Sequence, residues 1–212
     1  MTFVTSTVTL VISGQVASAQ YVLGEREATT VPGATDVLRQ EHQTIKGALG
    51  FAEKIAAKMN RDEVTPSEGV QRLMEFIRLF VEPCHHSKEE KILFPLLEKK
   101  GIPVNGGPLG VMLMEHERAR VLIEEMSAAA GNGLAPDSAK RWMGAAWDYS
   151  DLMFDHFYKE EEMLFKMADR VLNEEEQAGM AGEFKKLESE KIGPGKHDQL
   201  RAMVEELIAQ NP

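Results

Sequence analysis

Cysteine is nearly absent from this sequence: Cys84 is the only one among 212 residues. A single thiol excludes a disulfide framework within the chain, and it also excludes a zinc or iron–sulfur site built from several cysteines of one chain. Histidine and carboxylate side chains therefore remain as metal ligands. The sequence also lacks an apolar run near the roughly 20 residues that a helix needs to cross a bilayer, so no membrane span is predicted.

Positive charge is scarce as well. The chain has 24 Lys and Arg against 34 Asp and Glu, which gives a formal net charge of −10. Its basic residues form no stripe that would neutralise a phosphate backbone, so nucleic acid is not an expected partner. One domain around a single core is the simplest prediction at this length. The sequence leaves a protein partner or a homo-oligomer open.

Residues 1–33 differ from the rest of the chain. A short apolar stretch, Val8 to Ile12, is followed by Ala17-Ser18-Ala19, which resembles a signal-peptidase site. However, no basic residue precedes the stretch, and Thr and Ser dilute it, which departs from the usual signal design. We therefore expect a strand-like or disordered N-terminal extension on a cytoplasmic protein. Export through an atypical signal is the alternative.

From Ala34 onward, apolar residues recur at intervals of three and four, which predicts amphipathic helices. Four helices are expected up to Leu172, with Pro66 at the start of the second. Each carries histidine on its apolar stripe: His42, His85, His116 and His156. Because short connections favour antiparallel neighbours, we predict an all-α fold: an antiparallel four-helix bundle over residues 34–172, with a C-terminal helical extension, residues 173–212, packed on it.

The second and fourth helices contain an internal repeat. The segment CHHSKEEKILF, residues 84–94, aligns without gaps over DHFYKEEEMLF, residues 155–165. This register pairs His85 with His156, Glu89 with Glu160, and His86 with Phe157. The first and third helices correspond in the same way, through the Glu-His dipeptides that end at His42 and His116.

Helix geometry favours one of the two adjacent histidines. Side chains four residues apart stack on one helix face, so His85 and Glu89 point together. His86 and Glu90 are rotated by about 100°, toward the edge of the buried face. We therefore predict that His85→Ala loses metal while His86→Ala largely keeps it, with His86 and Glu90 as second choices or hydrogen-bond partners of ligands. Tyr149, seven residues before His156, is either a hydrogen-bonding group near the site or a core aromatic.

These residues resemble the hemerythrin-like, or HHE cation-binding, family over roughly Ala34 to Leu172. The resemblance lies in the order Glu-His, His-x-x-x-Glu-Glu-x-x-Leu-Phe, Glu-His, His-x-x-x-Glu. It implies an antiparallel four-helix bundle around a non-haem, oxo-bridged di-iron centre, with histidines as terminal ligands and two carboxylates as bridges. Carried over to this sequence, it implies the metal ligands His42, His85, Glu89, His116, His156 and Glu160.

One departure bears on function. Oxygen-carrying hemerythrins have a His-x-x-x-His pair on the third helix, whereas Arg120 and Met112 stand four residues from His116 here. Reversible oxygen carriage is therefore less expected than binding, sensing or processing of oxygen, nitric oxide or peroxide. Four imidazoles and two carboxylates suit iron, with manganese and zinc as the other candidates. Such a ligand set leaves open positions on two metals for a small ligand.

Two other functions stay open on the sequence alone. One is an iron storage or delivery module, and the other is a helical interaction domain, with or without a stabilising metal. Metal binding is favoured because burying Glu89 and Glu160 without a cation would cost several kcal/mol each. The sequence identifies no catalytic acid and no organic cofactor. Enzymatic activity would be at most di-iron redox turnover of peroxide or nitric oxide.

Overall fold

The structure is a computed structural model that describes residues 6–12, 15–21, 32–61, 67–131 and 134–210. The chain divides into two units, Met1–Val31 and Pro32–Pro212. In the first, strands β1 (Ser6–Ile12) and β2 (Gln15–Tyr21) pair in antiparallel register, with Val8 opposite Ala19. The expected extension is thus a β-hairpin over these residues.

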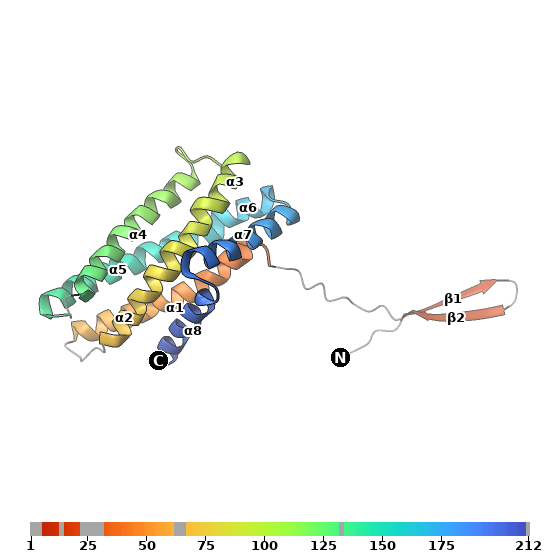
Figure 1. The fold of residues 1–212 in the computed structure, drawn as a ribbon. Coiled ribbons are helices and arrows are strands. Elements are labelled where there is room, and N and C mark those ends of the chain that lie inside the picture. Colours follow the sequence, from red (N-terminus) through yellow and green to blue (C-terminus); the bar gives the residue numbers. More distant parts are fainter. Residues whose placement is uncertain (1–5, 13–14, 22–31, 62–66, 132–133, 211–212) are drawn as a thin grey trace. The chain divides into compact units, whose positions relative to one another are not determined.

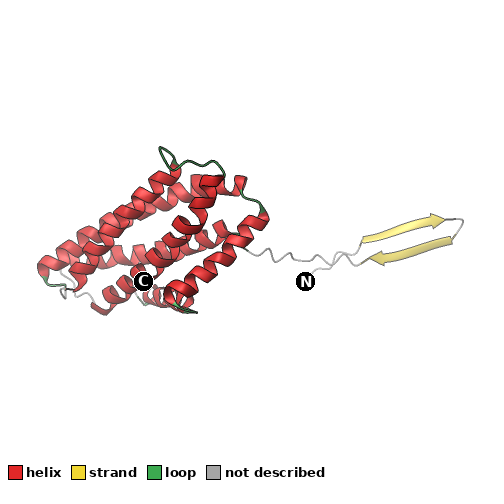
Figure 2. Ribbon diagram, turned by 45° about the horizontal axis from the view of Figure 1, so that its top comes forward, coloured by secondary structure: helices red, strands yellow, loops and turns green. Residues whose placement is uncertain are grey.

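The regular structure described in the second unit is helical (Figure 2). Its α-helices are α1 (Ala34–Asn60), α2 (Ser67–Phe76), α3 (Phe94–Lys99), α4 (Pro108–Gly131), α5 (Pro136–Lys159), α6 (Phe165–Val171), α7 (Glu174–Ile192) and α8 (Lys196–Ala209). Three further segments are π-helical: η1 (Ile77–His86), η2 (Glu89–Leu93) and η3 (Glu160–Leu164). The all-α prediction is confirmed, while the helix start expected at Pro66 lies outside the described residues.

The four predicted helices form the bundle. The second runs from α2 through η1 and η2 into α3, and the fourth runs from α5 through η3 into α6. Helix α5 packs against both α4 and α1, and α4 and α5 lie side by side (Figure 1). Among the described helices, none combines the length and the apolar character that crossing a membrane would require.

The apolar core is divided into two clusters along the bundle. One cluster contains Leu49, Phe80 and Trp142, and the other contains Leu93 and Phe165. Each of the four long helices places a buried histidine between the two clusters, and buried glutamates accompany it on the first, second and fourth. A polar layer therefore crosses the bundle, in a place where ordinary packing would require apolar side chains.

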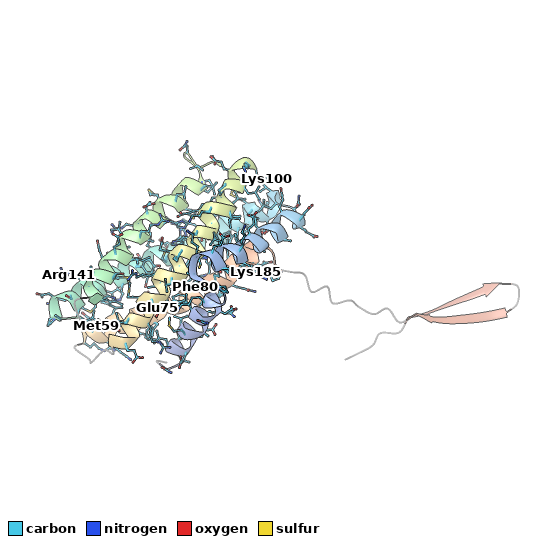
Figure 3. The ribbon with its side chains drawn as sticks, viewed as in Figure 1. Met59, Glu75, Phe80, Lys100, Arg141 and Lys185 are labelled. Carbon is cyan, nitrogen blue, oxygen red and sulfur yellow. The ribbon has the colours of Figure 1, made fainter. Side chains whose placement is uncertain are left out.

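The C-terminal helices cover one side of this polar layer. Helix α7 packs on α1 and η1, and α8 packs on α1 and α2. The ring of His197, at the start of α8, stacks on Phe80 of η1 with their centroids 4.6 Å apart. Phe80 is labelled in Figure 3. The extension is thus packed directly against the segment that carries His85 and His86.

Candidate metal centre

The polar layer brings the predicted ligands together. All six have side chains with 0% exposure: His42, His85, Glu89, His116, His156 and Glu160. Two overlapping groups each place one ligand atom per residue within 4.8 Å of the others. The groups are His42, His85, Glu89 and Glu160, and His86, Glu89, His116 and His156. Glu89 belongs to both groups, and His86 joins the residues that the sequence pattern selected.

The prediction that His86 lies toward the edge of the buried face is wrong. Its side chain has 0% exposure, and its ring stacks on that of His116 with the centroids 3.9 Å apart. The cause is the π-helical conformation of η1, because i→i+5 hydrogen bonds widen each turn and adjacent side chains are separated by less than the α-helical rotation. Pro83 lies inside η1 and has no N–H for an α-helical hydrogen bond. This proline was the feature of the sequence that could have indicated the departure from α-helical geometry.

Five histidines of the polar layer are each oriented by a carboxylate. The Nδ1–H groups of His42, His85, His86, His116 and His156 donate to Glu161 (2.9 Å), Glu41 (3.0 Å), Glu82 (2.6 Å), Glu90 (2.7 Å) and Glu115 (3.0 Å), respectively. Because a carboxylate is an acceptor, the Nδ1 atom carries the proton in each neutral ring, and Nε2 presents its lone pair inward. Such carboxylates fix the rings of metal-binding histidines and raise their basicity.

The carboxylate partners follow the internal repeat. In each Glu-His dipeptide, the glutamate bonds the histidine of the next long helix: Glu41 bonds His85, and Glu115 bonds His156. Glu90 and Glu161, which are equivalent in the repeat, bond His116 and His42. The pair of Glu82 with His86 has no counterpart, because the equivalent positions are Met153 and Phe157. Glu82 was missed in the sequence, although it stands four residues before His86.

Most atoms that face into the centre have no hydrogen-bond partner in the part of the chain that the structure describes. They are His42 Nε2, His85 Nε2, His86 Nε2, and both carboxylate oxygens of Glu89 and of Glu160. The Nε2 atoms of His116 and His156 face each other at 3.1 Å. Buried polar atoms almost always have partners in folded proteins, and an unpartnered buried carboxylate is costly. Nitrogen lone pairs and carboxylate oxygens converging on one place are a donor set that fits metal ions.

Protons partly replace the missing cations in the metal-free protein. Burial alone would lower the pKa of His116, but the adjacent carboxylates of Glu89 and Glu90 raise it to about 9. Burial alone would raise the pKa of Glu89, but the nearby charges of His85 and His116 lower it to about 2. Burial and repulsion from Glu89 hold the pKa of Glu160 well above its usual value. A cation held by His116 and Glu160 would have to displace protons from them.

Tyr149 does not hydrogen-bond to the centre. Its side chain has 0% exposure and belongs to the apolar cluster that also contains Trp142. Its hydroxyl makes no hydrogen bond among the described residues, and burial raises its pKa. The placement corresponds to a core aromatic residue.

A buried lysine connects the centre to the C-terminal helices. The Lys88 ammonium is fully buried and pairs with Glu41 and, at 2.6 Å, with Glu188 of α7. His197 of α8 donates from Nε2 to Glu41 at 2.9 Å. Glu41, which orients His85, is therefore itself held by residues of the extension. Sequence reasoning missed Glu188 and His197, since neither has a counterpart in the repeat.

We expect Lys88→Met to lower the free energy of unfolding of the metal-free protein by about 3–5 kcal/mol, because Glu41 would remain buried without its cation. Urea unfolding measures this loss. Lys159→Met is the matched control: it stands at the equivalent repeat position and pairs with Glu115, but its side chain is 32% exposed. Its loss should cost about 1 kcal/mol or less. Equal losses in the two variants would contradict the assigned role of Lys88.

Comparison with known proteins adds independent information. Residues 33–168 match the family described as the hemerythrin HHE cation binding domain. An uncharacterized protein of Mycobacterium tuberculosis is 27% identical over 165 residues, which cover 76% of this chain and 63% of that protein. The chain thus spans less than two thirds of the length of this relative.

Two shorter matches have names that mention iron. A probable iron-sulfur cluster repair protein of Haemophilus influenzae is 32% identical over 102 residues, or 46% of this chain and 44% of that protein. An iron-sulfur cluster repair protein of Neisseria gonorrhoeae is 32% identical over 85 residues, or 38% of this chain and 54% of that protein. No solved structure was found to match the chain.

Proposed function

Because the chain belongs to the hemerythrin HHE cation-binding family, as a metal-binding helical domain, we propose that its buried centre holds two iron ions and there binds oxygen, nitric oxide or peroxide. The observation that carries this proposal is the convergence of unpartnered, fully buried ring nitrogens and carboxylate oxygens. A structural role for these groups would leave their burial uncompensated.

The contacts of the two carboxylates support a shared, two-metal centre. Glu89 places Oε1 3.5 Å from His85 Nε2 and Oε2 3.4 Å from His116 Nε2. Glu160 Oε2 lies 3.2 Å from His42 Nε2 and 3.4 Å from His156 Nε2. Each carboxylate therefore adjoins histidines from both groups. We assign His42 and His85 to one metal, His86, His116 and His156 to the other, and Glu89 and Glu160 to both.

The donor set and the relatives together favour iron. Imidazole and carboxylate ligands also accept manganese and zinc, so the ligands alone do not choose. The names of the repair-protein relatives favour iron over these two. When bound, iron supplies redox chemistry and open coordination positions for a small ligand. The chain itself holds the histidine rings through their Nδ1 carboxylates, and the Phe157 ring, 4.1 Å from that of His42, keeps water from one side.

The same relatives favour a second candidate, iron storage or delivery. Both iron-sulfur cluster repair proteins match less than half of this chain. In that function the centre would release iron to an acceptor protein. The two candidates share the same ligands and differ in whether the iron stays and responds to small ligands.

Metal analysis and optical spectra of protein purified from iron-replete cells test both candidates. We expect about two irons per chain and a charge-transfer absorption that azide, nitric oxide or peroxide changes. Stoichiometric zinc, or protein that takes up no metal, would contradict the proposal. If these ligands do not change the absorption of the bound iron, but the iron passes to a metal-free acceptor protein, delivery would be favoured instead.

A further inference from the structure

A surface cleft lies next to the metal centre, between η1 and α4. It has a volume of about 420 Å³ and is lined by Arg78, Glu82, Arg120, Ile123, Glu124 and Ser127. A second cleft of about 470 Å³, which Glu75 also lines (Figure 3), shares Arg78 and Ser127 with it. The two clefts are therefore adjacent.

The inner end of the 420 Å³ cleft touches the partners of two histidines. Glu82 accepts a hydrogen bond from Arg120 Nε at 2.8 Å and from His86 Nδ1 at 2.6 Å. Arg120 also donates to Glu90, whose carboxylate accepts from His116 Nδ1 at 2.7 Å. One layer of polar side chains, Glu82 with Arg120 and Glu90, thus separates the cleft from the stacked rings of His86 and His116.

The repeat-equivalent side of the centre is closed by apolar groups. Phe157 and Met153 occupy the positions that correspond to His86 and Glu82, and both have 0% exposure. Lys46, the equivalent of Arg120, donates to Glu161 at 2.7 Å. Of the two equivalent sides, the one with His86 and Glu82 therefore offers a polar path from the surface to the centre.

The cleft also carries unused hydrogen-bond donors. Arg78 is exposed and makes no ion pair with any described residue. The hydroxyl of Ser127, which lines the same cleft, is buried and has no hydrogen-bond partner among the described residues. The exposed guanidinium of Arg78, which lines the cleft, is suited to receive a small anion.

We infer that this cleft is the entrance through which small anions, such as azide, nitrite or hydroperoxide, reach the metal centre. The inference rests on the proposed function and adds the route and the charge class of the ligand. The pair of Glu82 and Arg120 forms the inner end of the entrance. The side with Phe157 does not admit the anion.

Filling the cleft tests the inference. Ser127→Phe places a ring in both clefts without replacing a proposed ligand or its carboxylate partner, and Arg78→Trp does the same from an exposed position. Azide association and dissociation are followed by stopped-flow absorbance on iron-loaded protein. We expect both rate constants to fall about tenfold or more, with the dissociation constant nearly unchanged, because a blocked entrance slows passage in both directions. Iron content and thermal unfolding temperature should match the wild type.

Glu53→Phe is the matched control, since Glu53 stands eleven residues after His42 as Ser127 stands eleven residues after His116. It should leave both rate constants unchanged. Wild-type rates in fully iron-loaded Ser127→Phe and Arg78→Trp would overturn the entrance, as would equal slowing in Glu53→Phe. Failure of the proposed function is distinguishable, because unsubstituted iron-loaded protein would then show no azide response.

Discussion

Glu89→Ala is expected to lose nearly all bound metal. Glu89 is the only residue shared by the two groups of converging ligand atoms. Its two oxygens face His85 and His116 on opposite sides, so its removal takes a ligand from both metals at once. We expect metal affinity to fall by more than about 100-fold, beyond the effect typical of losing a hydrogen-bond partner of a ligand. Metal analysis after dialysis against a weak chelator measures this loss.

The stability of the metal-free form distinguishes a ligand from a structural residue. In the metal-free protein, Glu89 is a buried carboxylate without hydrogen bonds to its oxygens. We therefore expect metal-free Glu89→Ala to unfold at nearly the same urea concentration as metal-free wild type, because the attraction between Glu89 and His116 is offset by the cost of burying the Glu89 charge. Added iron should stabilise the wild type but not the variant.

Glu162→Ala provides the control for Glu89→Ala. Glu162 lies two residues after Glu160, pairs with Lys166 at the surface, and has a side chain that is 50% exposed. Its loss should leave both metal content and metal-dependent stabilisation unchanged. If Glu89→Ala kept its metal and instead destabilised the metal-free protein, Glu89 would be a structural group and the shared centre would be wrong.

His86→Phe is expected to lose about half of the metal, from about two ions per chain to about one. The substitution gives the first half of the repeat the residue that the second half has at Phe157. The group of His42, His85, Glu89 and Glu160 keeps all its members, whereas the other group loses a ring nitrogen. Metal content and the azide-dependent absorption change should decrease together.

His85→Ala completes this comparison. It should also lose metal, from the group that His86→Phe spares, so the two variants should retain different ions. Full metal content in His86→Phe would mean that His86 lies outside the ligand set, as the α-helical register implied. Its burial and its stacking on His116 would then serve packing alone.

Local patterns determined much of this protein at the level of sequence. The three-and-four spacing of apolar residues predicted the long helices, because a helical period follows from backbone geometry that each segment carries by itself. The i, i+4 pairs and the repeat then selected six residues that the structure places together. Those pairs lie within single helices, so their common direction does not depend on how the helices pack.

The backbone conformation of η1 and the packing of the helices decided the rest. His86 enters the centre because η1 is π-helical, a departure from the α-helical period on which the sequence argument relied. The carboxylate partners of His85 and His156 come from other helices, and Lys88 meets Glu188 only because α7 packs on η1. The sequence by itself determined which helix faces carry the candidate ligands, since that geometry is local. Packing between distant segments decided which carboxylate orients four of the five rings, those of His42, His85, His116 and His156.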